Sequence, residues 1–452
     1  MQKTIFSPEE TNGALWYKFK KSSWGKLHDT LPLEQLSSCL PAPKNTCGRK
    51  EYFDNAGKFA LMFLKHELDV SDEKLIDHIN HNPSLQLFCG MRLGNLELIG
   101  DTGIVSRIRG FIAHHADLEK VQRILIDHWQ ADIDMAHVLK MDATCFESYI
   151  RYPSDVKLLW ECCEWVYNNH LFPFRKSLKI RLGKEKERFD NQKRKYLGYS
   201  KLKRKAYKKT RKRIKSLLNL LNKGIAALQS LLDQYFKGSL DKSFYQYLKT
   251  IRKIYQQQDY LFKHPGSKIK NRIVSLHKPY IRPIKRGNEN KPTEFGAKVH
   301  MLQVGGISII EHFSYNAFNE CKRLKMSIWK HKTMFGKCHQ VSGDRIYATG
   351  RHSCNENRRF CTENKIFNSF DPKGRKPDKA ILKLKAALNK DRATRLEGSF
   401  GNQKNHYGLR KVKARSRLNE KVWIFFGVFT ANAVFIAKKK NCNKHSMTAF
   451  AA

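Results

Sequence analysis

The sequence has few acidic residues for its length. Of its 452 residues, 41 are Asp or Glu and 86 are Lys or Arg, which gives a formal net charge of +45. A small-molecule enzyme with a balanced surface would not carry this excess, because like charges repel one another in a compact state. Nucleic acid is the counter-ion that fits, with an anionic membrane as the alternative. The 41% hydrophobic content excludes disorder of the whole chain. The length of 452 residues predicts about two to four domains.

Long hydrophobic runs and a disulfide framework are also missing. The longest apolar run, 422–437, is interrupted by Gly427, Thr430 and Asn432 and is shorter than the ~20 residues of a membrane span. We interpret it as a buried core helix and expect no membrane partner. The N-terminus has no basic segment before an apolar one, so no signal peptide is expected. The 11 scattered cysteines indicate a reducing compartment, which we take to be the cytoplasm, in association with the nucleoid.

Residues 1–135 predict several short helices separated by tight breaks. Ser71 can cap one helix, with Asp72 and Glu73 in its first turn, and Asn82-Pro83 can end it. Such a pattern is typical of a helix-turn-helix-like DNA-binding module and equally of an ordinary helical bundle. We therefore expect a helical N-terminal DNA-binding domain over 1–135, with the plain bundle as the open alternative.

The most basic stretch is 174–215, with 20 Lys or Arg against three acidic residues. A solvated helix face would mix both signs of charge, so this stretch predicts contact with a polyanion. The candidate DNA-binding residues within it are Lys209, Arg211, Lys212 and Arg213.

A coiled-coil seam follows the basic stretch. Apolar residues from Ile214 to Tyr235 alternate in steps of four and three, and Phe244 to Tyr255 continue a similar seam. We predict an antiparallel helical hairpin, with a dimerising coiled coil as the alternative. The whole basic helical insert is expected to occupy 163–279.

Strand patterns lie on both sides of this insert. Residues 137–152 are rich in β-formers, and Gly305-Gly306 joins the two apolar segments 295–304 and 307–316 as a hairpin. The fold class predicted is therefore α/β, a mixed-sheet core in two parts, 136–162 and 280–437, interrupted by the helical insert. The tail, 438–452, is expected to be disordered.

Three carboxylates stand at strand ends or on a late helix of this core: Asp142, Asp344 and Glu397. Three acids can converge on one site only if a cation offsets their repulsion, and Mg²⁺ accepts a few carboxylate oxygens together with water and phosphate oxygens. Residue patterns alone do not single them out, because Asp132, Asp134 and Glu294 are further candidates and each acid is also compatible with a plain surface role.

A zinc site is the competing interpretation of the same region. Two histidines and three cysteines cluster in sequence around Asp344, but their spacing contains no CxxC pair, which strong zinc signals usually have. We therefore expect the carboxylates to be the metal ligands. The residues weighed and set aside are Cys338, His339, His352, Cys354 and Cys361.

The chain resembles insertion-sequence transposases of the DDE type, in the group with an N-terminal helical domain and a ribonuclease H-like core. The resemblance is carried by MDATCFESYIRYPSD around Asp142, NENKPTEFGAKVHMLQVGGISIIEH at 288–312, SGDRIYATGRHSCNENRRFC around Asp344, and RLEGSFGNQKNHYGL around Glu397. It covers 137–162 and 280–437, and the first 130 residues more loosely. Many relatives carry their extra domain near the late helix, whereas this insert follows the first strand.

The resemblance implies that Asp142, Asp344 and Glu397 bind Mg²⁺ or Mn²⁺. Relatives often have a basic residue seven positions after the glutamate, which is Lys404 here. An arginine four positions before the glutamate is common in some relatives; here that position is Ala393, with an arginine on each side of it, Arg392 and Arg395.

The activity implied is metal-dependent cleavage of the element ends and transfer of the freed 3′-hydroxyl into target DNA. Double-stranded DNA is then the partner, as terminal repeats and as target, bound by a homodimer on paired ends. Lys404 and Arg395 are expected to hold phosphate, and Tyr347 either contacts DNA near Asp344 or packs in the core. The alternatives are a catalytically inactive DNA-binding protein derived from a transposase, and a nuclease that does not join strands.

Overall fold

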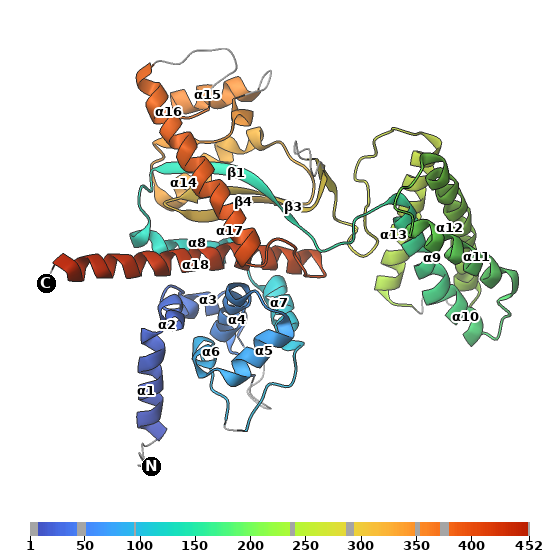
Figure 1. Ribbon diagram of the computed structural model, residues 1–452, viewed down its shortest axis with the longest axis horizontal. Coiled ribbons are helices and arrows are strands. Elements are labelled where there is room, and N and C mark those ends of the chain that lie inside the picture. The colour runs from blue at the N-terminus through green and yellow to red at the C-terminus, as the bar shows by residue number, and fades with distance from the viewer. Residues whose placement is uncertain are drawn as a thin grey trace. The chain divides into compact units, whose positions relative to one another are not determined.

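The computed structural model describes residues 8–42, 51–94, 96–235, 240–285, 293–348, 353–370 and 379–450. The chain is of mixed α/β class and divides into two compact units (Figure 1). The first comprises Met1–Tyr149, Ala297–Ser314 and Phe318–Ala452, and the second comprises Ile150–Gly296 with Tyr315–Ala317. The second unit contains the expected insert, 163–279, and extends beyond it at both ends.

Short capped helices fill the N-terminal part of the first unit. Asp54 accepts a hydrogen bond from the Gly57 amide and Ser71 from the Lys74 amide, which satisfies amides that the first helical turn leaves free. The helices are α1 (Pro8–Lys21), α2 (Ser23–His28), α3 (Leu33–Ser37), α4 (Asn55–Leu68), α5 (Asp72–His81), α6 (Pro83–Phe88), α7 (Ile104–His115) and α8 (Leu118–Trp129).

A six-stranded mixed sheet follows, in the order β2-β3-β1-β5-β6, with β4 also paired to β3. The predicted hairpin is confirmed, because β3 and β4 pair antiparallel and Gly305 and Gly306 both have positive φ, at 55° and 94°. β1 pairs with β5 in parallel, and so does β5 with β6. The strands are β1 (Val138–Glu147), β2 (Pro283–Lys285), β3 (Thr293–Val304), β4 (Ile307–Ser314), β5 (Gln340–Ser342) and β6 (Phe367–Asn368).

The helix α18 (Arg417–Phe450) lies between the sheet and the N-terminal helices of the first unit (Figure 1). On one side Phe426 packs against Phe59 and Phe63 of α4, with ring centroids 6.0 and 5.1 Å apart. On the other side Asn432 bonds both the amide and the carbonyl of Ser308 in β4.

The apolar part of α18 is long enough to cross a membrane, but 78% of it is buried inside the protein, as expected for a core helix. α18 is helical over 438–450, although we expected the tail, 438–452, to be disordered.

The second unit is a helical bundle. The predicted hairpin is present as α12 (Tyr207–Tyr235) and α13 (Lys242–Lys263), which pack against each other. Their seam is buried within the chain, but α12 also packs along α9, so its buried stripe is wider than the predicted seam and includes Leu217, Leu220 and Leu231. The other helices are α9 (Asp155–Val166), the π-helix η2 (Tyr167–Leu171), α10 (Phe172–Ser177) and α11 (Gly183–Ser200).

Candidate active site

The register of β1 and β5 places two of the predicted acids at the same level on neighbouring strands. Lys140 pairs with Ser342, and this pair is the last of the ladder between the two strands. Asp142 and Asp344 each follow two residues later, so both leave this ladder at the same level. We expected Asp142 at the end of its strand; it lies instead in the interior of β1, which runs on to Glu147.

One arginine joins Asp142 to Glu397. Arg392 Nη1 lies 2.6 Å from Asp142 Oδ2 and 3.1 Å from Glu397 Oε1, so these two carboxylate oxygens are at most 5.7 Å apart, the sum of the two distances. The side chain of Arg392 is 13% exposed. The structure therefore brings two of the three predicted acids together around one positive group.

A π-helix explains why Arg392 occupies this position. Residues Arg392–Glu397 form the π-helix η5, between α16 (Lys379–Asp391) and α17 (Gly398–His406). In a π-helix the hydrogen bonds span five residues instead of four, so the side chains at positions 392 and 397 come to the same face. From the sequence, Arg392 was noted only as a neighbour of Ala393. Its position could not be predicted, because the residue pattern does not indicate that the helix widens into a π-helix here.

The Asp142 carboxyl lies in a largely buried, acid-rich position. Burial raises its pKa to about 6, opposed by Arg392 and by the Ala143 amide, which donates to Oδ1 at 2.7 Å. Glu320 and Glu397 raise the pKa further. Glu320, which sequence reasoning missed, lies in η3 (Glu320–Arg323) and pairs with Lys298 at 2.7 Å. An added positive charge beside this carboxyl would therefore stabilise its ionised form.

A second ion pair runs beside the first. Lys140, two residues before Asp142 on β1, pairs with Asp391, the residue before Arg392. Asp391 also binds Arg395, at 3.0 Å, while the Arg395 side chain is 65% exposed. Arg395 thus keeps an accessible guanidinium on the rim of a cavity of about 650 Å³ lined also by Lys140 and Asp391.

Lys404 approaches the far part of β1. Its ammonium lies 5.9 Å from the centroid of the Phe146 ring, and the neighbouring Glu147 is paired with Lys411. Lys404 lies on α17, and its role in holding phosphate stays a prediction.

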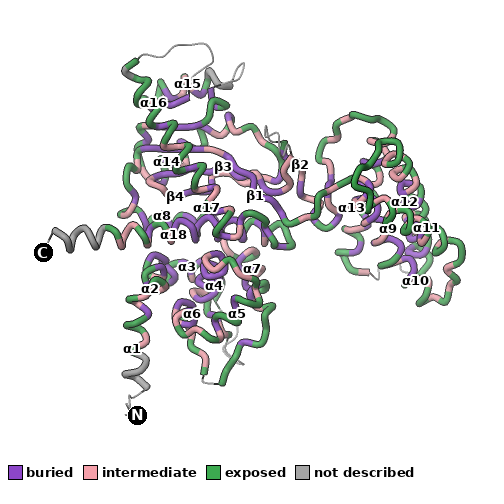
Figure 2. The backbone as a smooth tube through the Cα atoms, viewed as in Figure 1, coloured by how far each residue is buried: buried purple, intermediate pink, exposed green. Residues whose placement is uncertain are grey.

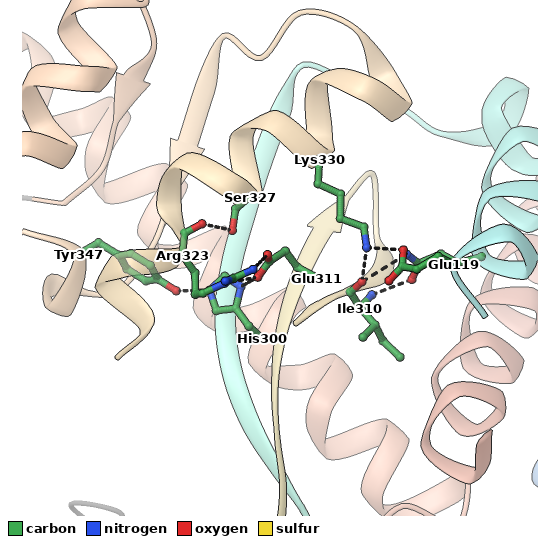
Figure 3. A network of polar contacts seen from close by, with 9 residues as sticks. Glu119, His300, Ile310, Glu311, Arg323, Ser327, Lys330 and Tyr347 are labelled. Carbon is green, nitrogen blue, oxygen red and sulfur yellow. Dashed lines mark hydrogen bonds and ion pairs between the residues drawn. The ribbon is translucent and has the colours of Figure 1, made fainter. Parts of the chain in front are cut away.

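Asp344 begins a tight turn at the edge of the sheet. It is exposed, and its Oδ1 accepts a hydrogen bond from the amide of Arg345, the first residue of η4 (Arg345–Tyr347). Tyr347 is completely buried and its hydroxyl lies 2.6 Å from His300 Nε2 (Figure 3). Of the two alternatives for Tyr347, the structure therefore supports core packing and contradicts contact with DNA.

No protein-family model, curated protein or solved structure matches the chain. The functional assignment accordingly depends on the residues and geometry described above.

Helix α12 of the second unit carries exposed, intermediate and buried residues (Figure 2), and the predicted DNA-binding residues on it differ in accessibility. Lys209 and Lys212 are exposed. Arg211 stacks on Phe262, 4.2 Å from the ring centroid, and Arg213 bonds Gln192 at 2.9 Å. Two of the four residues are thus free to meet a polyanion, whereas the two arginines also hold the bundle together.

The carboxylates fit a divalent cation by donor type and by charge. Within the described ranges, no three His, Cys, Asp or Glu side chains stand close enough to hold a metal ion. Arg392, however, places one positive group between Asp142 and Glu397. A divalent cation in that position would have carboxylate oxygens as ligands. The other acids considered from the sequence are otherwise engaged: Asp134 pairs with Lys439 and Asp132 with Lys440, both on α18.

Proposed function

We propose that the chain is a DDE-type DNA transposase of an insertion sequence, with a helical N-terminal DNA-binding domain and a ribonuclease H-like core. The observation that carries the proposal is the meeting of Asp142 and Glu397 on Arg392. It is supported by the position of Asp344, which follows β5, the strand paired in parallel with β1. The acids come from elements remote in sequence, in the order that the resemblance implies.

The chain's own residues would bind and orient the DNA. Mg²⁺ or Mn²⁺ held by Asp142, Asp344 and Glu397 would activate the attacking oxygen and stabilise the leaving one in phosphodiester chemistry. Arg392 would turn its guanidinium toward the scissile phosphate, because a forked donor suits phosphate oxygens. Lys404 and Arg395 would hold the backbone on either side.

The exposed lysines of 201–215, the basic face of the second unit, would supply affinity for duplex DNA. These lysines neutralise phosphates without reading sequence, as expected for binding to both element ends and target. The protein would act in the cytoplasm on the nucleoid, as a homodimer that pairs two ends.

The test compares isosteric variants of the acids: Asp142→Asn, Asp344→Asn and Glu397→Gln. Glu363→Gln, which neutralises an exposed acid in the same unit, is the matched control. The substrate is the genomic DNA that flanks the coding sequence, with Mg²⁺ or Mn²⁺. We expect the three variants to bind this DNA normally and to cleave it roughly 10²–10³-fold more slowly or not at all, and the control to cleave like the wild type.

Each alternative has its own outcome. Wild-type protein that binds the DNA and never cuts it would be the inactive DNA-binding derivative. Cleavage without joining to a second duplex would indicate a nuclease. Cleavage by all three variants at the wild-type rate would remove these acids from the site.

A further inference from the structure

Figure 3 shows a chain of polar side chains in the first unit, formed by Tyr347, His300, Glu311 and Arg323. The Tyr347 hydroxyl lies 2.6 Å from His300 Nε2, and His300 Nδ1 lies 2.9 Å from Glu311 Oε2. Glu311 is held in turn by Arg323, which binds it through two nitrogens. The side chains of His300 and Glu311 are 0% and 2% exposed. None of these four side chains is used by the proposed chemistry.

The protons in this chain have one consistent arrangement. Although burial opposes its ionisation, contacts with His300 and Arg323 hold the pKa of Glu311 below its ordinary value, so it is a carboxylate. Burial raises the pKa of Tyr347 well above its ordinary value, so its phenol keeps its proton. The phenol therefore donates to His300 Nε2, whereas His300 Nδ1 lies within ion-pairing distance of Glu311 without an aligned hydrogen bond. The Tyr347–His300 and Arg323–Glu311 hydrogen bonds, with the short His300–Glu311 contact between them, tie the four side chains together.

A β-bulge brings Glu311 to His300. In the β3–β4 ladder His300 pairs with His312, but the next residue, Met301, pairs with Ile310, which leaves Glu311 as the extra residue. A bulge of this kind redirects a side chain and is frequent beside active sites. Without it, Glu311 would follow the normal alternation of the strand and would not share a position with His300.

The other end of the chain is the turn that carries Asp344. The Tyr347 amide donates to the Asp344 carbonyl at 3.0 Å, and Asn357 Nδ2 donates to the Tyr347 carbonyl at 3.3 Å. Gly343 lets the Tyr347 ring pack beneath the turn, because a Cβ there would stand 2.7 Å from Tyr347 Cδ2. Position and orientation of the turn are thus set by the same ring whose hydroxyl meets His300.

We propose that Tyr347, His300, Glu311 and Arg323 form a positioning relay that holds Asp344 at the level of Asp142 for metal binding. The inference rests on the proposed function and adds to it residues that touch neither DNA nor metal. They are positioning residues: they fix the place of a ligand, and their loss weakens metal use before it weakens DNA binding.

The test removes one hydroxyl with Tyr347→Phe in the full-length chain. Tyr167→Phe is the matched control, because Tyr167 is also buried and its hydroxyl donates to the Leu220 carbonyl at 3.0 Å, in the second unit. Hydrogen exchange of residues 343–348 and the Mg²⁺ concentration for half-maximal cleavage are measured in both. For Tyr347→Phe we expect exchange at least ~10-fold faster and a half-maximal Mg²⁺ concentration ~10-fold higher, with unchanged DNA affinity and a smaller deficit at saturating Mn²⁺.

A double-mutant cycle sharpens the test. If the hydroxyl acts through the imidazole, His300→Asn with Tyr347→Phe should cost no more than the larger single effect. Additive effects, or a Mg²⁺ midpoint equal to that of the wild type, would overturn the relay. If wild-type protein cuts no DNA, the proposed function fails, and the exchange of 343–348 decides the relay alone: unchanged exchange in Tyr347→Phe overturns it.

Discussion

The two units use their charged residues in opposite ways. In the first unit some basic side chains turn inward and are paired: Lys65 and Lys140 are each 4% exposed and bind Asp72 and Asp391. In the second unit the lysines of 201–215 face solvent, and acidic partners are few there. A paired lysine cancels against its acid, so the net charge of +45 comes from unpaired side chains such as those of 201–215.

The largest expected effect follows from the exposed face of the second unit. Lys208, Lys212 and Lys215 lie at intervals of four and three on α12, so they share one helical face. Replacing all three by Ala should weaken duplex DNA binding roughly 10²–10³-fold near 0.1 M salt and lower the slope of log K against log[salt] by about 2.7. The measurement is a salt titration of binding to a fluorescent duplex.

Three lysines on α13 supply the control for this prediction. Lys242, Lys249 and Lys253 are also exposed and also share a face, and their replacement removes the same charge from the same unit. A loss of affinity equal to that of the α12 variant would show that total charge matters and the basic face does not.

An intermediate effect is expected from packing inside the second unit. Gly224 of α12 faces Tyr167, and a Cβ at this position would lie 2.4 Å from Tyr167 Cε2. Gly224→Ala should destabilise this unit by about 1–3 kcal/mol, as overpacking does. Thermal unfolding should show one transition moving down and the transition of the first unit staying in place.

Gly198→Ala is the control for Gly224→Ala, and we expect it to change the stability of the second unit in the opposite direction. Gly198 lies within α11 and nothing stands within 4 Å of the Cβ it would gain, so Ala should stabilise the helix by up to ~1 kcal/mol. If Gly224→Ala were equally stabilising, the close approach of α12 to Tyr167 would be refuted.

The smallest expected effect is a loss of stability of the first unit at acidic pH. His66 of α4 is buried with Nδ1 2.9 Å from the Tyr407 carbonyl, and burial lowers its pKa to about 3, opposed by that carbonyl. Because the unfolded histidine titrates near 6.5, the unfolded state binds the extra proton, and stability falls as pH falls from 6.5 toward 3. The expected loss between pH 7 and 5.5 is about 1 kcal/mol.

His66→Gln checks the source of this acid sensitivity. Glutamine keeps a donor for the Tyr407 carbonyl but does not titrate between pH 7 and 5.5. Urea unfolding at the two pH values should therefore show a smaller pH difference in the variant than in the wild type. An identical difference would assign the sensitivity to other groups.

Local sequence signals predicted the elements but not how they meet. The Gly305-Gly306 hairpin, the strand that carries Asp142 and the paired helices of the second unit were all visible, because turn residues and apolar spacing act locally. The packing of Phe426 between α18 and α4 was not visible, since sequence periodicity says which side of a helix is apolar and not what covers it. The N-terminal helices, which we expected to form a domain of their own, belong to the same compact unit as most of the sheet.

The acids of the candidate site came from the family resemblance, and their geometry came from the structure. Asp142 and Glu397 were named, but Arg392 became their partner only through the π-helix, and Glu311 reached His300 only through a bulge. Both are one-residue departures from regular hydrogen bonding. Such departures are decided by tertiary packing, and residue patterns carry little trace of them. The burial of Tyr347 has the same origin, because it depends on the missing side chain of Gly343.

Arg392 also bears on how the protein should be handled. A fold whose acidic centre relies on a bound ion for charge balance unravels when chelator strips that ion away. Here the guanidinium already offsets part of the charge of Asp142 and Glu397 from within the chain. Purification in EDTA should therefore leave the melting temperature unchanged.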